Sequence, residues 1–345
     1  MNSSALRILL QTTTPASHDD WSIDSFSLLR RQLEAFGAQG RPVVVTARNR
    51  EVSGSANDPI LAEIDQSDFD ELWLFALDWG AGLTAEECAA IGRFRRRGGG
   101  LVTARDHQDL GSSLCFLDGG VGAANHFHSR NCEADASRRG ADDRETTMIS
   151  WPNYHSGSNG DFQRITAIGP VHPLLLDPEN RKRTLEFFPS HPHEGAVSAP
   201  PEDESARVIA VGHSTASGRP FNLVVAFESR SDRDGPLPGR AVAHSSFHHF
   251  ADYNWDTRSG APSFVTEPEG TGMASNARAA ADIRAYVGNL ARWAAPAGKR
   301  APERKTRIGR RLEDATGAVV SALSQAEADR WEAGVGSTES QRSDA

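Results

Sequence analysis

The chain has 345 residues, of which 38% are hydrophobic and 24% charged, so it can bury a sizeable core in one large domain or two smaller ones. A formal net charge of -9 and a pI near 5.7 argue against a broad nucleic-acid surface, which requires clustered lysine and arginine. The three cysteines lack C-x-x-C spacing, so they indicate neither a disulfide framework nor a cysteine-rich zinc site. A small-molecule ligand is therefore the expected partner.

No segment of the sequence is typical of export or membrane insertion. The apolar run near the N-terminus is too short for a signal peptide, and nowhere does the sequence reach the roughly 18 consecutive apolar residues of a membrane-spanning helix. We expect a soluble, cytoplasmic protein with no nucleic-acid or membrane partner. Assembly into a homo-oligomer is compatible with these features.

Strands and helices are predicted to alternate in the first third of the chain. Apolar runs predict the strands, and amphipathic segments with helical spacing predict the helices. In chain order these are a strand at 5–14, a helix at 21–40, strands at 41–47 and 69–77, a helix at 83–100 and a strand at 100–104. Thr84 and Glu87 have the spacing of a capping box at the start of the second helix. This alternation predicts an α/β fold with a doubly wound, mainly parallel sheet covered by helices on both faces.

The alternation stops after Ala104. Residues 105–160 are rich in Gly, Asn, Asp, Ser and Arg, and we expect a long insertion that acts as a lid or binding loop, because loops beyond about 15 residues are usually functional or disordered. Later strands are predicted at 161–168, 207–214, 221–229 and 240–246, and a last helix at 274–295. Four residues of that helix are expected to face the sheet: Ile283, Val287, Leu290 and Trp293. The chain thus divides into one domain, 1–295, and a basic linker with a largely disordered tail, 296–345.

The polar residues directly after the predicted strands are the first site candidates. In open α/β sheets, ligands bind at the carboxyl ends of the strands. The residues expected to converge there are His18, Asp19, Asp78, Trp79, Arg105, Asp106 and His107. For each of them the alternative is a local role, such as starting a helix or capping a turn.

Several motifs resemble those of ThuA-like proteins. They are "SHDD" after the first strand, the glycine triplet before the strand at 100–104, "GPVHPLL", "SHPHEG", "GRAVAHSSFHHFADYNWD" and "NLARW". Over residues 5–295 the sequence is similar to this trehalose-utilisation branch of the class I glutamine-amidotransferase-like superfamily. The resemblance implies a flavodoxin-like sheet and a sugar-related or otherwise hydrolytic role.

The sequence departs from this pattern in two respects. A glutamine amidotransferase needs a cysteine nucleophile on the turn after a strand, whereas "ARDHQ" stands there, so glutaminase activity is not expected. The ThuA-like pattern would place a histidine directly after the strand, where this chain has Arg105, with His107 two residues on. Cys115 is either a displaced nucleophile or, between Leu114 and Phe116, a small apolar filler.

The segment "PSHPHEG", residues 189–195, is a candidate metal site. His191 precedes a proline and so favours extended backbone, in which His191 and His193 project to the same side. They could share a divalent transition metal such as Zn or Fe, with Glu194 or Asp252 completing an open three-ligand site. No diagnostic spacing such as H-E-x-x-H is present, so a metal-free site stays open.

Without a metal, the same histidines could act as acids and bases, because imidazole titrates near neutrality. The candidate pairs are His248 or His249 with Asp252, and His107 with Asp106 or Asp109. The leading hypothesis is an enzyme that acts on a small polar, carbohydrate-related ligand; its catalytic candidates are Asp106, His107, His248 and Asp252, and its ligand-binding candidates His18, Asp78, Trp79, Arg105 and His244. The alternative is a non-catalytic binding or assembly module that keeps the fold without the cysteine nucleophile.

Overall fold

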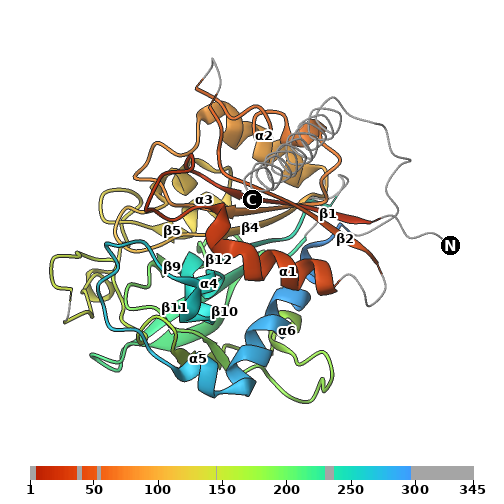
Figure 1. Cartoon of the computed structure of the whole chain (residues 1–345). Helices are drawn as coiled ribbons and strands as arrows, with labels where there is room; N and C mark the ends of the chain where they lie inside the picture. Colours follow the sequence, from red (N-terminus) through yellow and green to blue (C-terminus); the bar gives the residue numbers. More distant parts are fainter. Residues whose placement is uncertain (1–4, 37–40, 53–55, 145, 230–236, 297–345) are drawn as a thin grey trace, which may run out of the picture. The chain divides into compact units, whose positions relative to one another are not determined.

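The computed structural model describes residues 5–36, 41–52, 56–144, 146–229 and 237–296 (Figure 1). The end of the helix predicted at 21–40 and nearly all of the predicted linker and tail, 296–345, lie outside these residues. Among the described helices, the longest is α6, and none combines the length and the hydropathy of a bilayer-spanning segment.

An eight-stranded sheet carries the fold, in the order β2-β1-β3-β4-β12-β11-β10-β7. In that order its strands are Val43–Arg48, Leu6–Thr12, Glu71–Phe75, Gly100–Ala104, Ala241–His244, Pro220–Phe227, Ala206–His213 and Thr166–Ala167. The pairings from β2 to β12 are parallel, and those from β12 to β7 are antiparallel. The parallel part has the strand order of flavodoxin-like sheets. The predicted α/β, mainly parallel fold is confirmed.

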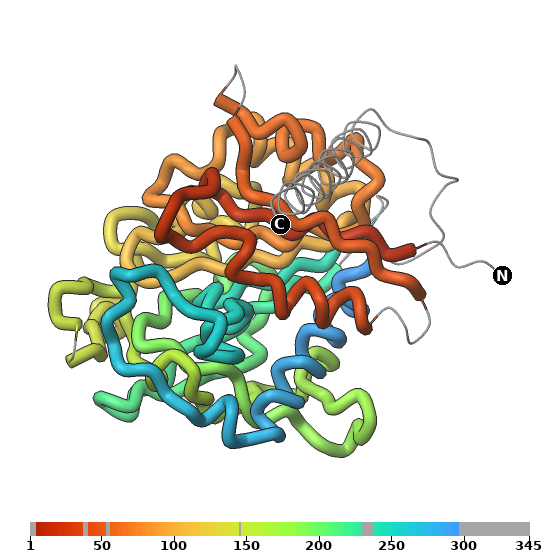
Figure 2. The backbone as a smooth tube through the Cα atoms, in the orientation of Figure 1, coloured from red at the N-terminus to blue at the C-terminus, as the bar shows by residue number. Residues whose placement is uncertain are grey.

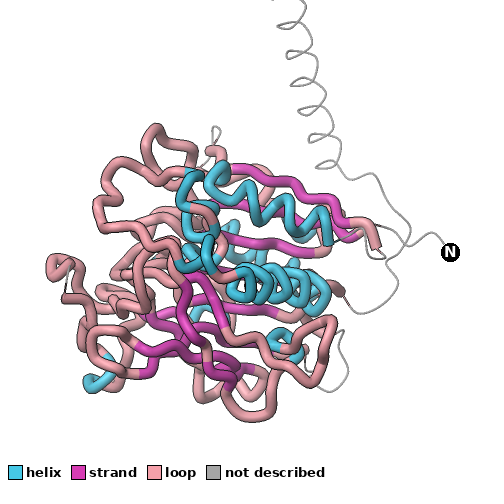
Figure 3. Tube along the Cα trace, turned by 60° about the horizontal axis from the view of Figure 1, so that its bottom comes forward, coloured by secondary structure: helices cyan, strands magenta, loops and turns pink. Residues whose placement is uncertain are grey.

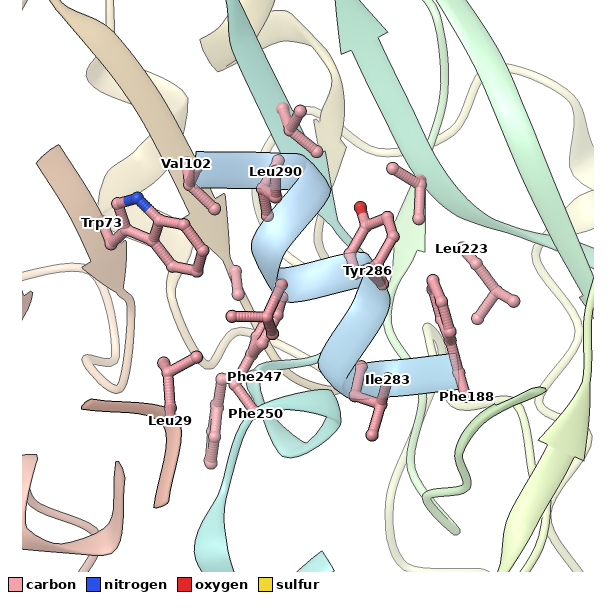
Figure 4. Packing of buried hydrophobic residues seen from close by; sticks show 14 of the residues in the cluster. Leu29, Trp73, Val102, Phe188, Leu223, Phe247, Phe250, Ile283, Tyr286 and Leu290 are labelled. Atoms are coloured by element: carbon pink, nitrogen blue, oxygen red, sulfur yellow. The ribbon is translucent and has the colours of Figure 1, made fainter. Parts of the chain in front are cut away.

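Helices cover both faces of this sheet, with α1 and α6 on one face and α2 on the other (Figure 1). Side chains alternate between the two faces along a strand. Trp73 of β3 therefore packs on the α1 and α6 side, in one cluster with Leu29 and Leu290 (Figure 4). The four residues of α6 predicted to face the sheet, Ile283, Val287, Leu290 and Trp293, are all buried.

The sequence signals at the helix ends explain where these helices begin. The helices are α1 Ser27–Phe36, α2 Ala85–Arg96, α3 Gly120–Ala123, α4 Asp252–Trp255, α5 Gly272–Ser275 and α6 Ala277–Ala294. Thr84 and Glu87 form the predicted capping box at the start of α2. At the start of α6, the Asn276 side chain accepts hydrogen bonds from the backbone N–H groups of Arg278 and Ala279.

Short elements and long loops make up much of the rest (Figure 3). Two small antiparallel pairs join β5 Asn125–His126 to β9 Ala196–Val197, and β6 Phe162–Arg164 to β8 Phe187–Pro189. The 3-10 helices are η1 Ile23–Phe26, η3 Ile64–Gln66, η4 Ser112–Phe116, η5 Ala136–Arg138, η6 Pro173–Leu175, η7 Phe247–His249 and η8 Thr257–Ser259. Residues 105–160, the predicted insertion, contain only short elements among their described residues, and they run at the same side of the molecule as residues 260–267 (Figure 2).

Candidate active site

A cavity of about 710 Å³ lies at the carboxyl ends of β1, β3, β4 and β12. The residues that line it directly after these strands are Thr13, Thr14, Leu77, Asp78, Trp79, Asp106, His107, Phe247 and His248. The insertion adds Met148 and Ile149, and the loop before α5 adds the stretch from Phe264 to Glu267. The cavity is therefore at the sheet edge where an open α/β fold binds its ligands.

Asp106 is the centre of this site. Its buried carboxylate lies among three imidazoles, with His191 Nδ1 3.5 Å from Oδ1, and His248 Nε2 and His107 Nε2 at 3.7 and 3.8 Å from Oδ2. Asp106 Oδ1 has no hydrogen-bond partner within the described part of the chain. A buried polar atom without a partner is unusual and calls for an explanation.

Burial and mutual charge set the protonation of this group. Burial raises the pKa of Asp106, but His107 and His248 lower it more, so the pKa lies below its ordinary value. Burial lowers the pKa of His107 to about 4 even though Asp106 opposes the shift, and burial also lowers the pKa of His191 well below its usual range. At neutral pH the site therefore contains an ionised Asp106 carboxylate beside the neutral imidazoles of His107 and His191.

The amide of Asn254 fixes the tautomer of His248. Asn254 Nδ2 donates to Asn159 Oδ1 and to the Ser190 carbonyl, both at 2.9 Å, so its Oδ1 is left to accept from His248 Nδ1 at 3.0 Å. A neutral His248 then carries its hydrogen on Nδ1 and turns a free Nε2 lone pair toward Asp106. Asn254, on α4, was not among the predicted site residues, although it stands in the segment "GRAVAHSSFHHFADYNWD".

His193 occupies a different environment from His191, although both line the cavity as the extended backbone predicts. Its Nδ1 lies 3.1 Å from Asp143 Oδ2 and its Nε2 3.1 Å from Glu267 Oε1. Burial lowers the pKa of His193, but these two carboxylates raise it to about 9, so the ring is a cation at neutral pH. Asp143 and Glu267 were not among the predicted site residues, because neither belongs to a motif nor follows a strand.

Glu194 does not join His191 and His193 in the cavity. Its buried carboxylate accepts hydrogen bonds from Ser156, Gln163, Ser245 and His249. Gly195 follows it where a Cβ would lie 2.5 Å from Arg105 Nε, so only glycine fits this close approach. Among the described residues, Asp106, His191 and His248 each offer one ligand-type atom, and these atoms lie within 4.8 Å of one another.

Arg105 is buried and is not among the residues that line the cavity. Its guanidinium donates to the carbonyls of Asp106, Gln108, His126 and Ala196, and it lies 3.7 Å from the centroid of the Phe127 ring. Burial lowers its pKa to about 9, which still leaves it charged at neutral pH. Through these contacts, Arg105 holds the insertion against the sheet.

The other predicted ligand-binding residues divide into two groups. Asp78 and Trp79 line the cavity, and the Asp78 carboxylate accepts from the hydroxyls of Thr13 and Ser113, both at 2.7 Å. His18 is exposed and His244 is buried against Tyr286, whose hydroxyl lies 2.9 Å from His244 Nε2; neither lines the cavity.

Asp252, predicted as a partner for His248, instead caps α1. Its carboxylate accepts from the backbone N–H groups of Ser27 and Leu28 at 2.9 and 2.7 Å, and from the Ser27 hydroxyl at 2.6 Å. A carboxylate at this position satisfies N–H groups that the first turn of a helix leaves unpaired.

Replacing Asp252 with alanine is therefore expected to lower the free energy of unfolding by about 1–2 kcal/mol. Urea unfolding followed by circular dichroism measures this change, with Asp252→Asn as the control that keeps one carbonyl acceptor and should lose less. If stability were unchanged while ligand turnover disappeared, Asp252 would act in the reaction and not as a cap.

Cys115 lies on η4 and is absent from the cavity lining. Burial raises the pKa of its thiol to about 11, although Arg105 and Arg130 act in the opposite direction. A thiol with such a pKa holds almost no nucleophilic thiolate at neutral pH.

With iodoacetamide at neutral pH, we expect the exposed Cys132 to be alkylated first, while Cys115 and the buried Cys88 react slowly. Because deprotonation is what limits Cys115, its labelling should accelerate as the pH rises toward about 11. Peptide mass spectrometry over a time course reads both rates. Faster modification of Cys115 than of Cys132 at neutral pH would support the alternative that Cys115 is a displaced nucleophile.

The fold and the cavity together define an α/β protein with a flavodoxin-like strand order and a buried histidine and carboxylate cluster at the carboxyl ends of its strands. No family model matches the sequence, and no curated protein matches it. Two of the solved structures that are similar to it are the following. One is a putative ThuA-like protein from Bacteroides uniformis, 12% identical with a TM-score of 0.35, over 74% of this chain and 86% of that one. The other is the glutaminase domain of Trypanosoma brucei CTPS with bound acivicin, 16% identical with a TM-score of 0.41, over 80% and 94%.

The first of these two proteins is described as ThuA-like, the family that the sequence motifs resemble. The strand order and the pairing of this chain establish its fold.

Proposed function

We propose that the cavity binds a small polar, carbohydrate-related ligand and that the cluster around Asp106 catalyses its hydrolysis. The observation that carries the proposal is an ionised, buried carboxylate in contact with three imidazoles inside a cavity at the strand ends. Perturbed titratable groups in a cleft are typical of catalytic sites.

The lining suits a ligand with both hydroxyl groups and apolar faces. Thr13, Thr14 and Asp78 provide polar groups on one part of the wall, while Trp21 and Trp79 provide flat aromatic surfaces. Sugar rings present hydroxyls at their rim and C–H groups on their faces, which fits such a combination. These residues support a carbohydrate-related ligand as the first class to screen.

His107 is the candidate for proton transfer, and His193 has a different role. The His107 side chain is 14% exposed, more than His191 at 2% or His248 at 4%, so it is best placed to exchange a proton with the ligand. Its pKa of about 4 makes it a neutral acceptor at neutral pH, and Asp106 stabilises the imidazolium as it forms. The His193 cation is paired with Asp143 and Glu267, and we assign it to holding these two segments at the cavity wall.

A panel of glycosides and disaccharides, assayed for released reducing sugar, tests the proposal. Asp106→Asn and His107→Gln should each lower kcat/KM about 10²–10⁴-fold, while His18→Ala, an exposed histidine outside the cavity lining, should leave it unchanged. Equal rates in Asp106→Asn and the wild type would contradict the proposal. Saturable binding without turnover would instead favour a non-catalytic binding module that keeps the fold without a cysteine nucleophile.

A further inference from the structure

We infer that Asp106, His191 and His248 together bind one divalent transition metal ion, Zn²⁺ or Fe²⁺, at the inner wall of the cavity. All three residues line the cavity, and one ligand-type atom of each lies within 4.8 Å of the other two. Two imidazoles and one carboxylate are a donor set that holds zinc or non-haem iron while leaving coordination positions open. The role of this ion in hydrolysis rests on the proposed function, because that function places the reacting ligand in the same cavity.

The distances between the donor atoms match those of a coordination sphere. A tetrahedral ion with metal–ligand bonds of about 2.0–2.1 Å separates its ligand atoms by about 3.4 Å. His191 Nδ1 lies 3.5 Å from Asp106 Oδ1, and His248 Nε2 lies 3.7 Å from Asp106 Oδ2. These pairs are longer than hydrogen bonds and close to the separation that an ion between them would impose.

The unpartnered oxygen of Asp106 is a second, independent observation. Asp106 Oδ1 is buried, points at the imidazoles and accepts no hydrogen bond from any described residue. Burial of a carboxylate oxygen without a partner costs free energy that a nearby cation would offset. A metal ion at this place explains why no N–H or O–H group has been positioned there.

The Asn254 side chain orients His248 in the way that metal-binding sites require. Asn254 Oδ1 accepts from His248 Nδ1 at 3.0 Å and leaves Nε2 free as a ligand. Metal-binding histidines generally have such a partner on one ring nitrogen, which fixes the tautomer and the ring orientation. For His191, Ser246 Oγ lies 3.2 Å from Nδ1, the nitrogen that faces Asp106, so coordination through Nδ1 would replace this contact.

Binding requires one ring to turn. The His191 and His248 rings are stacked, with centroids 3.6 Å apart and an interplanar angle of 14°. An ion shared by two stacked rings would lie out of the plane of at least one of them, whereas an imidazole lone pair lies in the ring plane. Asn254 holds His248, whereas among the described residues the His191 side chain has a hydrogen-bond contact with Ser246 alone, so His191 is the ring that turns.

The ion would supply the water for hydrolysis. Coordination lowers the pKa of a bound water to about 7, which provides a nucleophile at neutral pH. The oxygen of that water bonds to the electrophilic carbon of the ligand, and the bond to the leaving oxygen breaks. One water proton passes through His107 to the leaving oxygen, so no oxidant or further reactant is needed.

Metal titration of the full chain tests the site. Protein stripped with EDTA is titrated with Zn²⁺, and anaerobically with Fe²⁺, and the bound metal is measured by elemental analysis after gel filtration. We expect one equivalent of ion in the wild type, and binding at least roughly 100-fold weaker in His191→Ala and in His248→Ala. Circular dichroism melting shows whether each variant folds, and Asp106→Asn serves as a near-isosteric third variant.

His193→Gln is the matched control. His193 lines the same cavity two residues from His191, but both its nitrogens contact the carboxylates of Asp143 and Glu267. Metal affinity should change by no more than about threefold in this variant. The inference is overturned if no stoichiometric ion binds, if His191→Ala and His248→Ala bind as the wild type does, or if His193→Gln alone loses the ion.

Comparing hydrolysis by the stripped and the reloaded protein separates this inference from the proposed function. If stripped protein turns over a glycoside as fast as reloaded protein, the metal site is refuted as part of the reaction and the proposed function stands. If one ion binds through the three residues but no glycoside is turned over, the metal site stands and the proposed function fails.

Discussion

Replacing Arg105 with alanine is expected to lower the free energy of unfolding by about 3–5 kcal/mol. The guanidinium is fully buried and donates to four backbone carbonyls, those of Asp106, Gln108, His126 and Ala196. The variant would leave these carbonyls buried without their donors and open a cavity beside Phe127. Urea unfolding followed by circular dichroism measures the change.

Arg105→Lys is the control that tests whether the planar guanidinium group, and not the positive charge alone, is needed. Lysine keeps a positive charge but cannot direct donors to carbonyls on several sides at once, so a partial loss of stability is expected. A loss below about 1 kcal/mol in Arg105→Ala would mean that water replaces the guanidinium at these carbonyls, and the anchoring role would be wrong.

A second large effect is expected at Glu194. Its buried carboxylate accepts from Ser156 at 3.0 Å, Gln163 at 2.6 Å, Ser245 at 2.7 Å and His249 at 3.0 Å. Glu194→Ala removes the acceptor common to these donors, and we expect the free energy of unfolding to fall by about 3–4 kcal/mol, as when a buried network loses its centre. Equilibrium unfolding in urea gives the value.

Glu194→Gln keeps the size of the side chain and removes the negative charge, so it shows how much the charge contributes to stability. The amide keeps one oxygen acceptor but presents a donor to groups that also donate, so its loss of stability should lie between those of wild type and alanine. Metal binding by the folded Glu194→Gln variant should match the wild type, because Glu194 is outside the cavity lining. Loss of the ion with unchanged stability would instead make Glu194 a ligand.

Local sequence signals predicted most of the sheet and part of the site. Apolar runs located β1, β3 and β4, and the residues directly after them, such as Asp78, Asp106 and His107, do line the cavity. This works because a parallel strand and the turn after it are adjacent in sequence, and the carboxyl ends of such strands share one edge.

Local sequence signals could not predict contacts between segments that are far apart in the chain. Asp143 and Glu267 reach His193 from segments without periodicity, so nothing in the sequence pairs them. Asp252 stands four residues after His248, but the short helices η7 and α4 turn its carboxylate toward α1 instead. Proximity in sequence was therefore a poor guide to pairing at this point.

The antiparallel half of the sheet has a clear physical cause. β10, β11 and β12 follow one another with no helix between them, as the predicted strands at 207–214, 221–229 and 240–246 already indicated. A parallel pairing needs a crossover of a dozen or more residues, usually a helix, while a short connection makes neighbouring strands antiparallel. The antiparallel pairing of β10 with β11 and of β11 with β12 follows.

The cavity residues are widely spaced along the chain, so they are synthesised at different times. During synthesis from the N-terminus, Asp106 and His107 leave the ribosome well before His191, His193, His248 and Glu267 exist. Until then the carboxylate has none of these later partners, and the pocket has no wall from residues 264–267. A nascent chain that stops before β12 would therefore carry the first strands of the sheet but an incomplete cavity, so the cavity forms only after residues 264–267 have been synthesised.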